Sequence, residues 1–252
     1  MKNKPLVSVV ITTMPGREEL LLRLLESIHR QTYNNIETII KCGGDNVQRA
    51  RNEGVSLATG KYIALADDDD EFHPEKIARQ VEYMEDHPSC ALCLCWGTDY
   101  KFGEKVLLAP QEHHTFEHLV SGFHISCTSA FLVRAKKFWL VGGMDESLVD
   151  SHEYDLAIRL SQVGTVYCVQ ENLVTFYETG SNWSSSFPKK IRGMFQFIAK
   201  YRRYFKLRRW VCTIGCLGLF GLGFCLGKYG AWIHKIFIVV KKFEINKESS
   251  MD

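Results

Sequence analysis

Two patterns of apolar and polar positions alternate along the first 170 residues of the chain. A run of apolar and β-branched residues at 6–13 is typical of a strand that is buried on both faces of a sheet, and the shorter apolar runs at 36–40 and 62–66 predict two further strands. Between these runs, apolar residues recur at helical spacing from Leu20 to Ile28 and again from Val47 to Leu57. Strands that alternate with helices predict an open α/β sheet, in which ligands bind beyond the carboxyl ends of the strands.

The same alternation continues along the chain, and candidate caps mark where helices begin. Asp45 is a candidate N-cap for the second helix, and Asp70 for the helix that Pro74 opens. The further elements that we expect are strands at 90–96, 125–133 and 165–169, and helices that begin near 74, 135 and 153.

Beyond about residue 180 the composition changes. A Ser-rich loop and a basic stretch occupy 181–209, which we expect to form a loop or lid and a linker. The run from Trp210 to Leu226 then carries no charge over 17 residues. As a helix it would be about 26 Å long, which is the lower limit for crossing a bilayer core.

Basic residues lie on both sides of this apolar region. Because the positive-inside rule places both flanks on the cytoplasmic face, we expect 210–245 to associate with the membrane as a re-entrant or interfacial helical hairpin. A helical appendage packed on the soluble core is the alternative. The expected division is therefore a globular domain at 1–180, a linker at 181–209 and an apolar segment at 210–245.

Composition and charge narrow the class of protein. The 31 basic and 29 acidic residues nearly cancel, so there is no overall electrostatic case for a nucleic-acid-binding protein. The nine cysteines are an odd number, and six lie inside apolar runs, which favours free thiols in a reducing compartment over a disulfide framework. The first apolar run lacks the cleavage site of a secretory signal, so we expect a cytoplasmic globular part. The six cysteines in apolar runs are Cys90, Cys93, Cys95, Cys212, Cys216 and Cys225.

Four consecutive aspartates, Asp67 to Asp70, follow the third expected strand directly. Carboxylates so close together repel one another, and a cation would resolve that repulsion. Ligands that are all oxygens select Mg²⁺ or Mn²⁺, which bind one or two carboxylates and complete their shell with phosphates and water. The run therefore predicts a divalent metal site that serves a nucleoside diphosphate. A solvated acidic turn, in which Asp70 only caps the next helix, is the alternative.

Several blocks of sequence share their order and spacing with one enzyme family. They are Val9–Thr13, Glu18–Tyr33, Ala50–Ile63 before the aspartates, Gly142–Leu148 and His152–Leu160. In these blocks the chain resembles the family 2 glycosyltransferases over roughly Pro5–Tyr177. The resemblance implies a GT-A fold, which is a Rossmann-like, open, mixed and mostly parallel sheet flanked by helices. It also implies a nucleotide-sugar donor, a divalent metal and inversion at the anomeric carbon.

The resemblance assigns roles to individual positions. Asp67, Asp68 and Asp69 fall on the D-x-D position of the family, where Asp69 is the best metal ligand. Asp67 and Asp68 face the ribose or the cation, so Asp67 is a candidate for both roles. The other positions that the resemblance places at the nucleotide are Thr13 and Met14, which border the nucleoside, and Arg51.

Inverting transfer needs a general base that takes the proton from the acceptor hydroxyl. The family usually supplies it from a Glu-Asp pair that opens a helix, and here the two positions are His152 and Glu153. Glu153 is therefore the candidate base. The alternative is that Glu153 only favours the N-terminus of its helix electrostatically. His152 is either a proton relay or an ordinary loop histidine.

Two departures from the family concern the nucleoside and processivity. Where many relatives carry paired aspartates followed by Gly-Ser, this chain has the segment 41–45, which ends in Asp45. Asp45 either takes over the contact with the base or only caps the helix. Processive relatives carry a Q-x-x-R-W motif, and the nearest string here, at 206–210, lacks the Gln, which favours one transfer per encounter.

The sequence thus predicts a metal-dependent, inverting glycosyltransferase that uses Mn²⁺ or Mg²⁺ and a nucleotide sugar, with a UDP-sugar as the first candidate. A saccharide or lipid-linked acceptor at the inner membrane surface, in surface polysaccharide biosynthesis, would explain the apolar segment. Two alternatives remain. One is a nucleotidyltransferase, for which Thr13–Arg17 would be a poor triphosphate-binding loop. The other is a catalytically silent, membrane-anchored binding protein.

Overall fold

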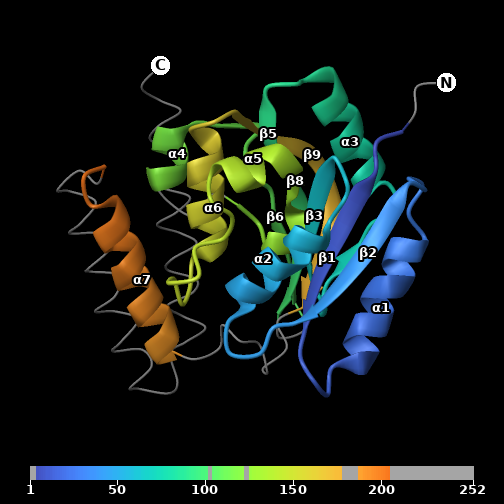
Figure 1. Ribbon diagram of the computed structural model, residues 1–252, viewed down its shortest axis with the longest axis horizontal. Coiled ribbons are helices and arrows are strands. Elements are labelled where there is room, and N and C mark those ends of the chain that lie inside the picture. Colours follow the sequence, from blue (N-terminus) through green and yellow to red (C-terminus); the bar gives the residue numbers. More distant parts are fainter. Residues whose placement is uncertain (1–3, 102–103, 122–124, 178–186, 205–252) are drawn as a thin grey trace. The chain divides into compact units, whose positions relative to one another are not determined.

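A computed structural model gives the fold (Figure 1). It describes residues 4–101, 104–121, 125–177 and 187–204. The chain divides after Arg202 into two compact units, and all the helices and strands given below lie in the first.

Within the described residues, nine strands form one sheet in the order β2-β1-β3-β8-β5-β9-β4, with β6 paired to β5 and β7 paired to β9. The strand β8 is antiparallel to both β3 and β5, so the five longest strands, β1, β2, β3, β5 and β9, point the same way. This confirms the mixed, mostly parallel sheet. The strands are β1 (Val7–Thr13), β2 (Ile36–Cys42), β3 (Tyr62–Asp67), β4 (Glu71–Phe72), β5 (Cys90–Lys101), β6 (Glu104–Leu108), β7 (His113–His114), β8 (Leu132–Arg134) and β9 (Thr165–Tyr177).

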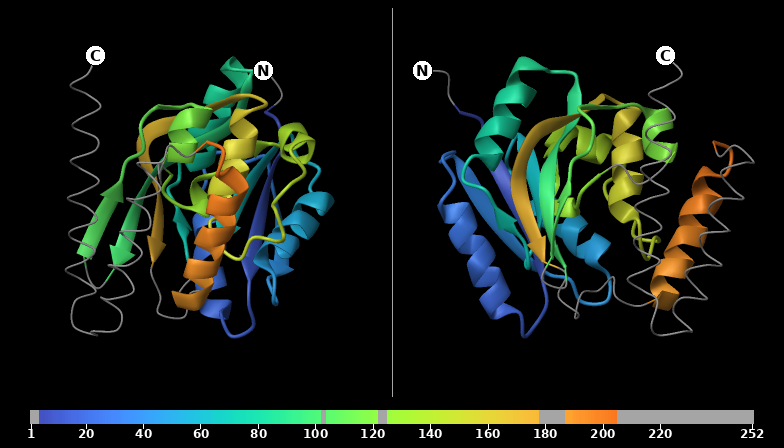
Figure 2. Two further views of the ribbon diagram at one scale, coloured as in Figure 1. Left: turned by 90° about the vertical axis from the view of Figure 1, so that its left-hand side faces the viewer. Right: turned by 180° about the vertical axis from the view of Figure 1, so that it is seen from behind.

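Helices cover both faces of the sheet (Figures 1 and 2). Alternate residues of β1 show this, because Val9 packs in the core that α1 and α3 close, whereas Val10 lies against α2 on the opposite face. The helices are α1 (Glu18–His29), α2 (Val47–Leu57), α3 (Lys76–Asp86), α4 (Phe116–Ser121), α5 (Ala135–Leu140), α6 (His152–Ser161) and α7 (Phe187–Tyr201), with a short 3₁₀ helix, η1 (Thr128–Ala130).

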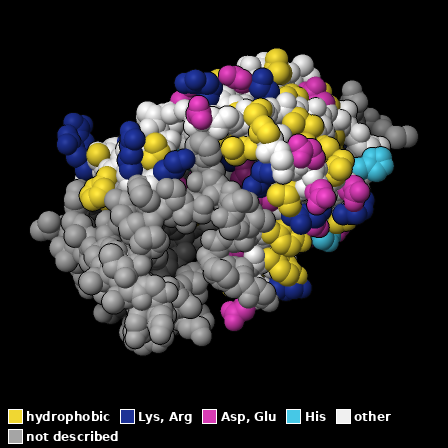
Figure 3. Space-filling view, turned by 90° about the horizontal axis from the view of Figure 1, so that it is seen from below, with side chains coloured by type: hydrophobic (Ala, Val, Ile, Leu, Met, Phe, Trp, Pro, Cys, Tyr) yellow, Lys and Arg dark blue, Asp and Glu magenta, His cyan; other side chains and the backbone are white. Residues whose placement is uncertain are grey.

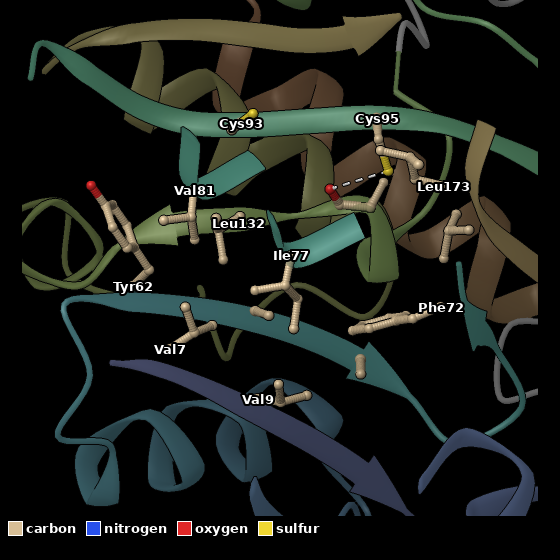
Figure 4. Close-up of a cluster of buried hydrophobic side chains, with 14 of the residues drawn as sticks. Val7, Val9, Tyr62, Phe72, Ile77, Val81, Cys93, Cys95, Leu132 and Leu173 are labelled. Carbon is tan, nitrogen blue, oxygen red and sulfur yellow. Dashed lines mark hydrogen bonds between the residues drawn. The ribbon is translucent and has the colours of Figure 1, made fainter. Parts of the chain in front are cut away.

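A cluster of buried hydrophobic side chains forms the core beneath α1 and α3 (Figure 4). Val9, Ile77 and Leu132 have no exposed surface, and Phe72 and Leu173 are almost as deeply buried. Of the cysteines expected in apolar runs, Cys90, Cys93 and Cys95 are free and fully buried on β5. Cys212, Cys216 and Cys225 lie outside the described residues. The surface in Figure 3 carries acidic and basic side chains interspersed, as the near balance of charges leads one to expect.

The helix α2 lies unusually close to the sheet. A Cβ added at Gly54 would lie 2.4 Å from Val10 Cγ1, so only glycine permits this approach. The N-cap of α2 is Asn46, whose side chain accepts a hydrogen bond from the backbone N–H of Arg49 at 2.9 Å. The prediction that Asp45 caps this helix was therefore wrong by one residue, because the backbone takes the extended cap conformation at Asn46.

The acidic turn does not supply a cap either. The helix α3 begins at Lys76 and follows Glu75, so Asp70 does not cap it and Pro74 lies just before it. Asp70 is instead buried in the turn after β3. The strand expected at 125–133 is also shorter than predicted, because η1 interrupts it and only β8 pairs with its neighbours. Within η1, the hydroxyl of Ser129 accepts a hydrogen bond from the Asp67 N–H at 3.0 Å.

The helix α7 lies where the sequence predicted a loop and a basic linker. It forms because one of its faces is apolar enough to pack, and Phe197, Ile198 and Tyr201 are buried on that face. The remaining stretches of the expected linker, 181–186 and 205–209, and the apolar segment 210–245 lie outside the described residues. No helix in the described ranges is long and apolar enough to cross a membrane.

Asp155 of α6 joins α6 to α7 through a buried ionic network. Its carboxylate has no exposed surface and contacts the Arg159 guanidinium at 2.6 Å, Lys200 Nζ at 2.6 Å and the Tyr201 hydroxyl at 2.7 Å. Arg159 also donates to the carbonyls of Val141 and Gly143. The carboxylate of Asp155 thus connects α6 to α7 and, through Arg159, to the turn at 141–143.

Replacing Asp155 by Asn is expected to lower the free energy of unfolding by about 2 kcal/mol, because hydrogen bonds to a buried charge are lost while both cations remain. For a domain of this size the melting temperature would fall by roughly 4–8 °C. Thermal and urea unfolding would measure the change. Glu75→Gln is the matched control, since its ion pair with Arg79 is exposed and contributes little. Equal stability of the two variants would contradict the prediction.

Candidate functional site

A pocket of about 290 Å³ opens at the carboxyl ends of β1 and β3. This is the edge at which an open α/β sheet is expected to bind its ligand. Asp45 is not among the lining residues, although its neighbours Gly43 and Gly44 are. The sequence-predicted site residues that line the pocket are Thr13, Met14, Arg51, Asp67, Asp68, Asp69 and Glu153.

The four aspartates are crowded in a tight turn, as their sequence suggested. Asp67 is the last residue of β3, and its carbonyl accepts a hydrogen bond from the Asp70 N–H at 3.2 Å. Asp68, Asp69 and Asp70 are all buried. Burial, and then the charge of Asp67, raises the pKa of Asp69, and the same two causes raise the pKa of Asp70 well above its usual range. The turn therefore holds more negative charge than its surroundings stabilise.

Arg17 is one of the pocket residues that the sequence did not single out. Its guanidinium binds both oxygens of Asp68, with Nη2 at 2.7 Å from Oδ1 and Nε at 2.9 Å from Oδ2. The same Nη2 lies 2.7 Å from Asp69 Oδ2. The hydroxyl of Thr13 donates a further hydrogen bond to Asp68 at 2.6 Å. Asp68 is thus held by two partners, and Arg17 supplies part of the positive charge that the sequence assigned entirely to a metal.

Arg51 connects the acidic turn to the helix that carries the candidate base. From α2 its buried guanidinium pairs with Asp67, and its Nη1 lies 2.7 Å from His152 Nε2. The other ring nitrogen of His152 lies 2.8 Å from Gln48 Nε2. Burial, and then the charge of Arg51, keeps the pKa of His152 well below its usual value. The imidazole is therefore neutral at pH 7 and fixed between α2 and α6, unlike an ordinary loop histidine.

Glu153 is the second residue of α6, which confirms that it opens the helix. Its side chain is 22% exposed and faces the pocket, and one carboxylate oxygen lies 3.4 Å from His152 Nε2. Burial, and then the charge of Asp150, raises the pKa of Glu153 to about 7. A carboxyl group with this pKa is partly deprotonated at neutral pH and still basic enough to accept a proton from a hydroxyl.

The loop 144–151 forms the wall of the pocket beside Glu153 and is held from two sides. From α2, Asn52 makes a pair of hydrogen bonds with the backbone of Met144, at 2.8 and 3.0 Å. From α7, the side chain of Gln196 accepts from the Val149 N–H at 3.1 Å and donates to the Ser147 carbonyl at 2.9 Å. Asn52 lies in a block that carried the family resemblance, but sequence gave no signal for Gln196, whose partners are 47 and 49 residues away.

The acidic turn offers a divalent cation oxygen ligands only, which suits Mg²⁺ or Mn²⁺. Burial, and then the charge of Asp67, raises the pKa of Asp69, and a cation would favour the ionised form of this carboxyl group. In the described part of the chain, no three His, Cys, Asp or Glu side chains converge to form a metal-binding group. The residues therefore fit a cation that takes one or two carboxylates, Asp69 and Asp67, and completes its shell with phosphate oxygens and water.

Sequence comparison finds the same family as the motifs. The model of the family described as "Glycosyl transferase family 2" matches residues 43–140. An uncharacterized glycosyltransferase of Methanocaldococcus jannaschii is 28% identical over 62% of this chain and 65% of its own length. WcaA of Escherichia coli, a glycosyl transferase by name and assigned by that name to colanic acid biosynthesis, is 25% identical over 81% of this chain and 84% of its own length.

Solved structures with the same fold include two that were determined with nucleotide sugars. Staphylococcus aureus TarS 1–349 in complex with UDP-GlcNAc aligns with a TM-score of 0.60 and 14% identity, over 72% of this chain and 61% of that one. The mannosyltransferase PcManGT of Pyrobaculum calidifontis, in complex with GDP-Man and Mn²⁺, aligns with a TM-score of 0.60 and 15% identity, over 81% and 66%. These alignments establish the GT-A fold. The ordered motifs, the match of residues 43–140 to the family model and the relatives named as glycosyltransferases together support a family 2 glycosyltransferase.

Proposed function

We propose that this protein transfers a sugar from a nucleoside diphosphate sugar to a hydroxyl group of an acceptor, with inversion and with Glu153 as general base. The observation that carries the proposal is one pocket that holds both the acidic turn and a carboxyl group with a pKa of about 7. Glu153 would accept the proton of the attacking hydroxyl, and the acidic turn would hold a divalent cation that serves the diphosphate of the donor. The fixed, neutral His152 would orient the carboxylate of Glu153 and leave it as the group that accepts the proton.

A divalent cation, Mn²⁺ or Mg²⁺, would be held by Asp69 and Asp67. When bound, it would neutralise charge that develops on the departing diphosphate. The Pyrobaculum mannosyltransferase, which was solved in complex with Mn²⁺, supports this part of the proposal. Asp68 would act differently from its neighbours, because Arg17 and Thr13 already hold both of its oxygens. We therefore assign Asp68 to the donor side of the pocket.

The donor is proposed to lie with its nucleoside along Thr13 and Met14 and its diphosphate toward Arg51 and the acidic turn. A UDP-sugar is the first candidate, and the complex of TarS with UDP-GlcNAc supports it. Because the Pyrobaculum neighbour carries GDP-Man, a GDP-sugar is the second candidate. Asp45 lies next to two pocket-lining glycines, and we propose it as a contact to the nucleoside base.

The acceptor is proposed to be a saccharide or a lipid-linked saccharide in surface polysaccharide biosynthesis, with one sugar added per encounter. The name of the Escherichia coli relative, which assigns it to colanic acid biosynthesis, supports this acceptor class. The reaction would then take place at the inner face of the cell membrane, to which residues 210–245 would attach the protein. The proposed metal ligands Asp67 and Asp69 and the proposed base Glu153 line one pocket of the globular unit. Donor binding and donor hydrolysis can therefore be measured without a membrane.

A panel of UDP- and GDP-sugars with MnCl₂ tests the proposed function. We expect at least one donor to raise the melting temperature and to release nucleoside diphosphate, slowly to water and faster to a saccharide acceptor. Release of pyrophosphate from a nucleoside triphosphate and a sugar phosphate would instead identify a nucleotidyltransferase. Donor binding without release to any acceptor or to water would support the catalytically silent binding protein.

A further inference from the structure

Arg17 binds a carboxylate oxygen of Asp69, one of the two residues proposed to hold a metal ion. Its side chain is 15% exposed, and one nitrogen bridges Asp68 and Asp69 at 2.7 Å from each. It comes from the loop between β1 and α1, where Gly16 adopts a positive φ of 82°. Arg17 is thus a charged group of the donor pocket that none of the roles assigned above uses in binding the donor.

The Arg17 guanidinium and a divalent ion would repel each other if both bound the carboxylate of Asp69. Mg²⁺ coordinates a carboxylate oxygen at about 2.0–2.1 Å, so an ion bound to Asp69 would lie next to the Arg17 guanidinium if Arg17 kept its contact with that carboxylate. Binding of the ion therefore requires Arg17 to leave Asp69. A guanidinium that leaves a buried carboxylate needs a new anionic partner, and the phosphates of a nucleotide are the anions that match its planar geometry.

We propose that Arg17 makes the binding of the cation and of the nucleoside diphosphate depend on each other. This inference rests on the proposed function. Without the nucleotide, Arg17 competes with the cation for Asp69. With the nucleotide, Arg17 moves from Asp69 to a phosphate oxygen, which frees Asp69 for the cation. Because coupling between two ligands is reciprocal, the cation must then strengthen nucleotide binding by the same factor.

A purely structural role makes a different prediction. If Arg17 only braced the turn through its contacts with Asp68, its loss would lower stability and leave the coupling between cation and nucleotide unchanged. The coupling factor is therefore the quantity that separates the two roles. Arg17→Gln removes the charge, whereas Arg17→Lys keeps the charge but cannot bind Asp68 with two parallel hydrogen bonds. Arg79→Gln is the matched control, because Arg79 is a half-exposed arginine of α3 that pairs only with surface glutamates in the described structure.

Binding of MnCl₂, of UDP and of GDP would be measured on the full chain, by electron paramagnetic resonance for Mn²⁺ and by calorimetry for the nucleotides. In the wild type and in Arg79→Gln, we expect one nucleotide to tighten Mn²⁺ binding at least ~10-fold. In Arg17→Gln, Mn²⁺ without nucleotide should bind at least ~10-fold more tightly than to the wild type. The factor by which the nucleotide tightens Mn²⁺ binding should fall toward one. Arg17→Lys should fall between them.

Two results would overturn the inference, and they are distinguishable. Nucleotide binding with the same coupling factor in the wild type and both Arg17 variants would remove the role of Arg17 and leave the proposed function intact. Absence of nucleotide binding to the folded wild type, with and without Mn²⁺, would contradict the proposed function and the inference together. Circular dichroism would check that each variant is folded before binding is measured.

Discussion

Replacement of Glu153 by Gln slows sugar transfer by at least ~100-fold in the reaction proposed here, because the amide cannot accept the proton of the attacking hydroxyl. Donor affinity should change little, since Glu153 is assigned to the acceptor proton and the acidic turn to the diphosphate. The side chain keeps its size, so the helix α6 and the loop before it should stay in place. Transfer rates and donor binding, measured on the same preparation, would separate the two effects.

The pH dependence gives a second measure of the same group. Burial and Asp150 raise the pKa of Glu153 to about 7, so the base is protonated and inactive below that pH. We expect kcat/KM to fall about tenfold per pH unit below about pH 7 and to level off above it. The other charged or titratable groups that interact with Glu153 are Arg51, Asp67, His152 and Tyr154. An acidic limb that persists unchanged in Glu153→Gln would show that another group is the base.

Replacement of Asp69 by Ala should abolish metal-assisted donor binding, with an affinity loss of at least ~100-fold, or about 2.7 kcal/mol. Asp69 is the carboxylate that combines a raised pKa with a position in the pocket beside Asp67, so it gains most from a cation. Asp69→Asn should lose nearly as much, because the neutral amide oxygen is a weaker ligand for a hard dication. Calorimetric titration with UDP or GDP, with and without MnCl₂, would measure the loss.

The control for the Asp69 variants is Asp86→Asn, which replaces an exposed carboxylate at the end of α3, away from the pocket residues. It should bind the donor as the wild type does. If Asp69→Ala bound the nucleotide with the same dependence on Mn²⁺ as this control, Asp69 would not be a metal ligand. A loss in Asp69→Ala that was equally large without Mn²⁺ would assign Asp69 to the nucleotide rather than to the cation.

The first half of the fold was predictable because it is encoded locally. The apolar runs at 6–13 and 62–66 belong to strands buried on both faces, and a helix with one apolar stripe lies between each pair of strands. Once the strands are parallel, their carboxyl ends must meet at one edge, so Thr13 and Asp67 come together without any knowledge of side-chain packing. Arg51 and Glu153 were placed at this edge by the family resemblance, and the structure brings both to the pocket.

The features that sequence reasoning missed depend on contacts between distant residues. Arg17 pairs with Asp68 across 51 residues, and nothing in the local pattern distinguishes it from other basic residues near a helix start. Asp45 and Asn46 are both good caps, so only the backbone conformation chooses between them. The strand β9 runs on to Tyr177 through the polar stretch 170–172, because β5 pairs with it on both sides of that stretch.

The loop 144–151 is held by hydrogen bonds from both α2 and α7, and this sets a lower limit on the length of a fragment that could fold and remain active. Gln196, Lys200 and Tyr201 of α7 lie far beyond residue 140, where the match to the family model ends. A protein shortened to residue 180 would retain the sheet, the acidic turn and Glu153, yet it would leave Asp155 without two of its three partners and Val149 without its anchor. Truncations made to remove the apolar segment should therefore be cut after Tyr201, where the last buried side chain of the globular unit lies among the described residues.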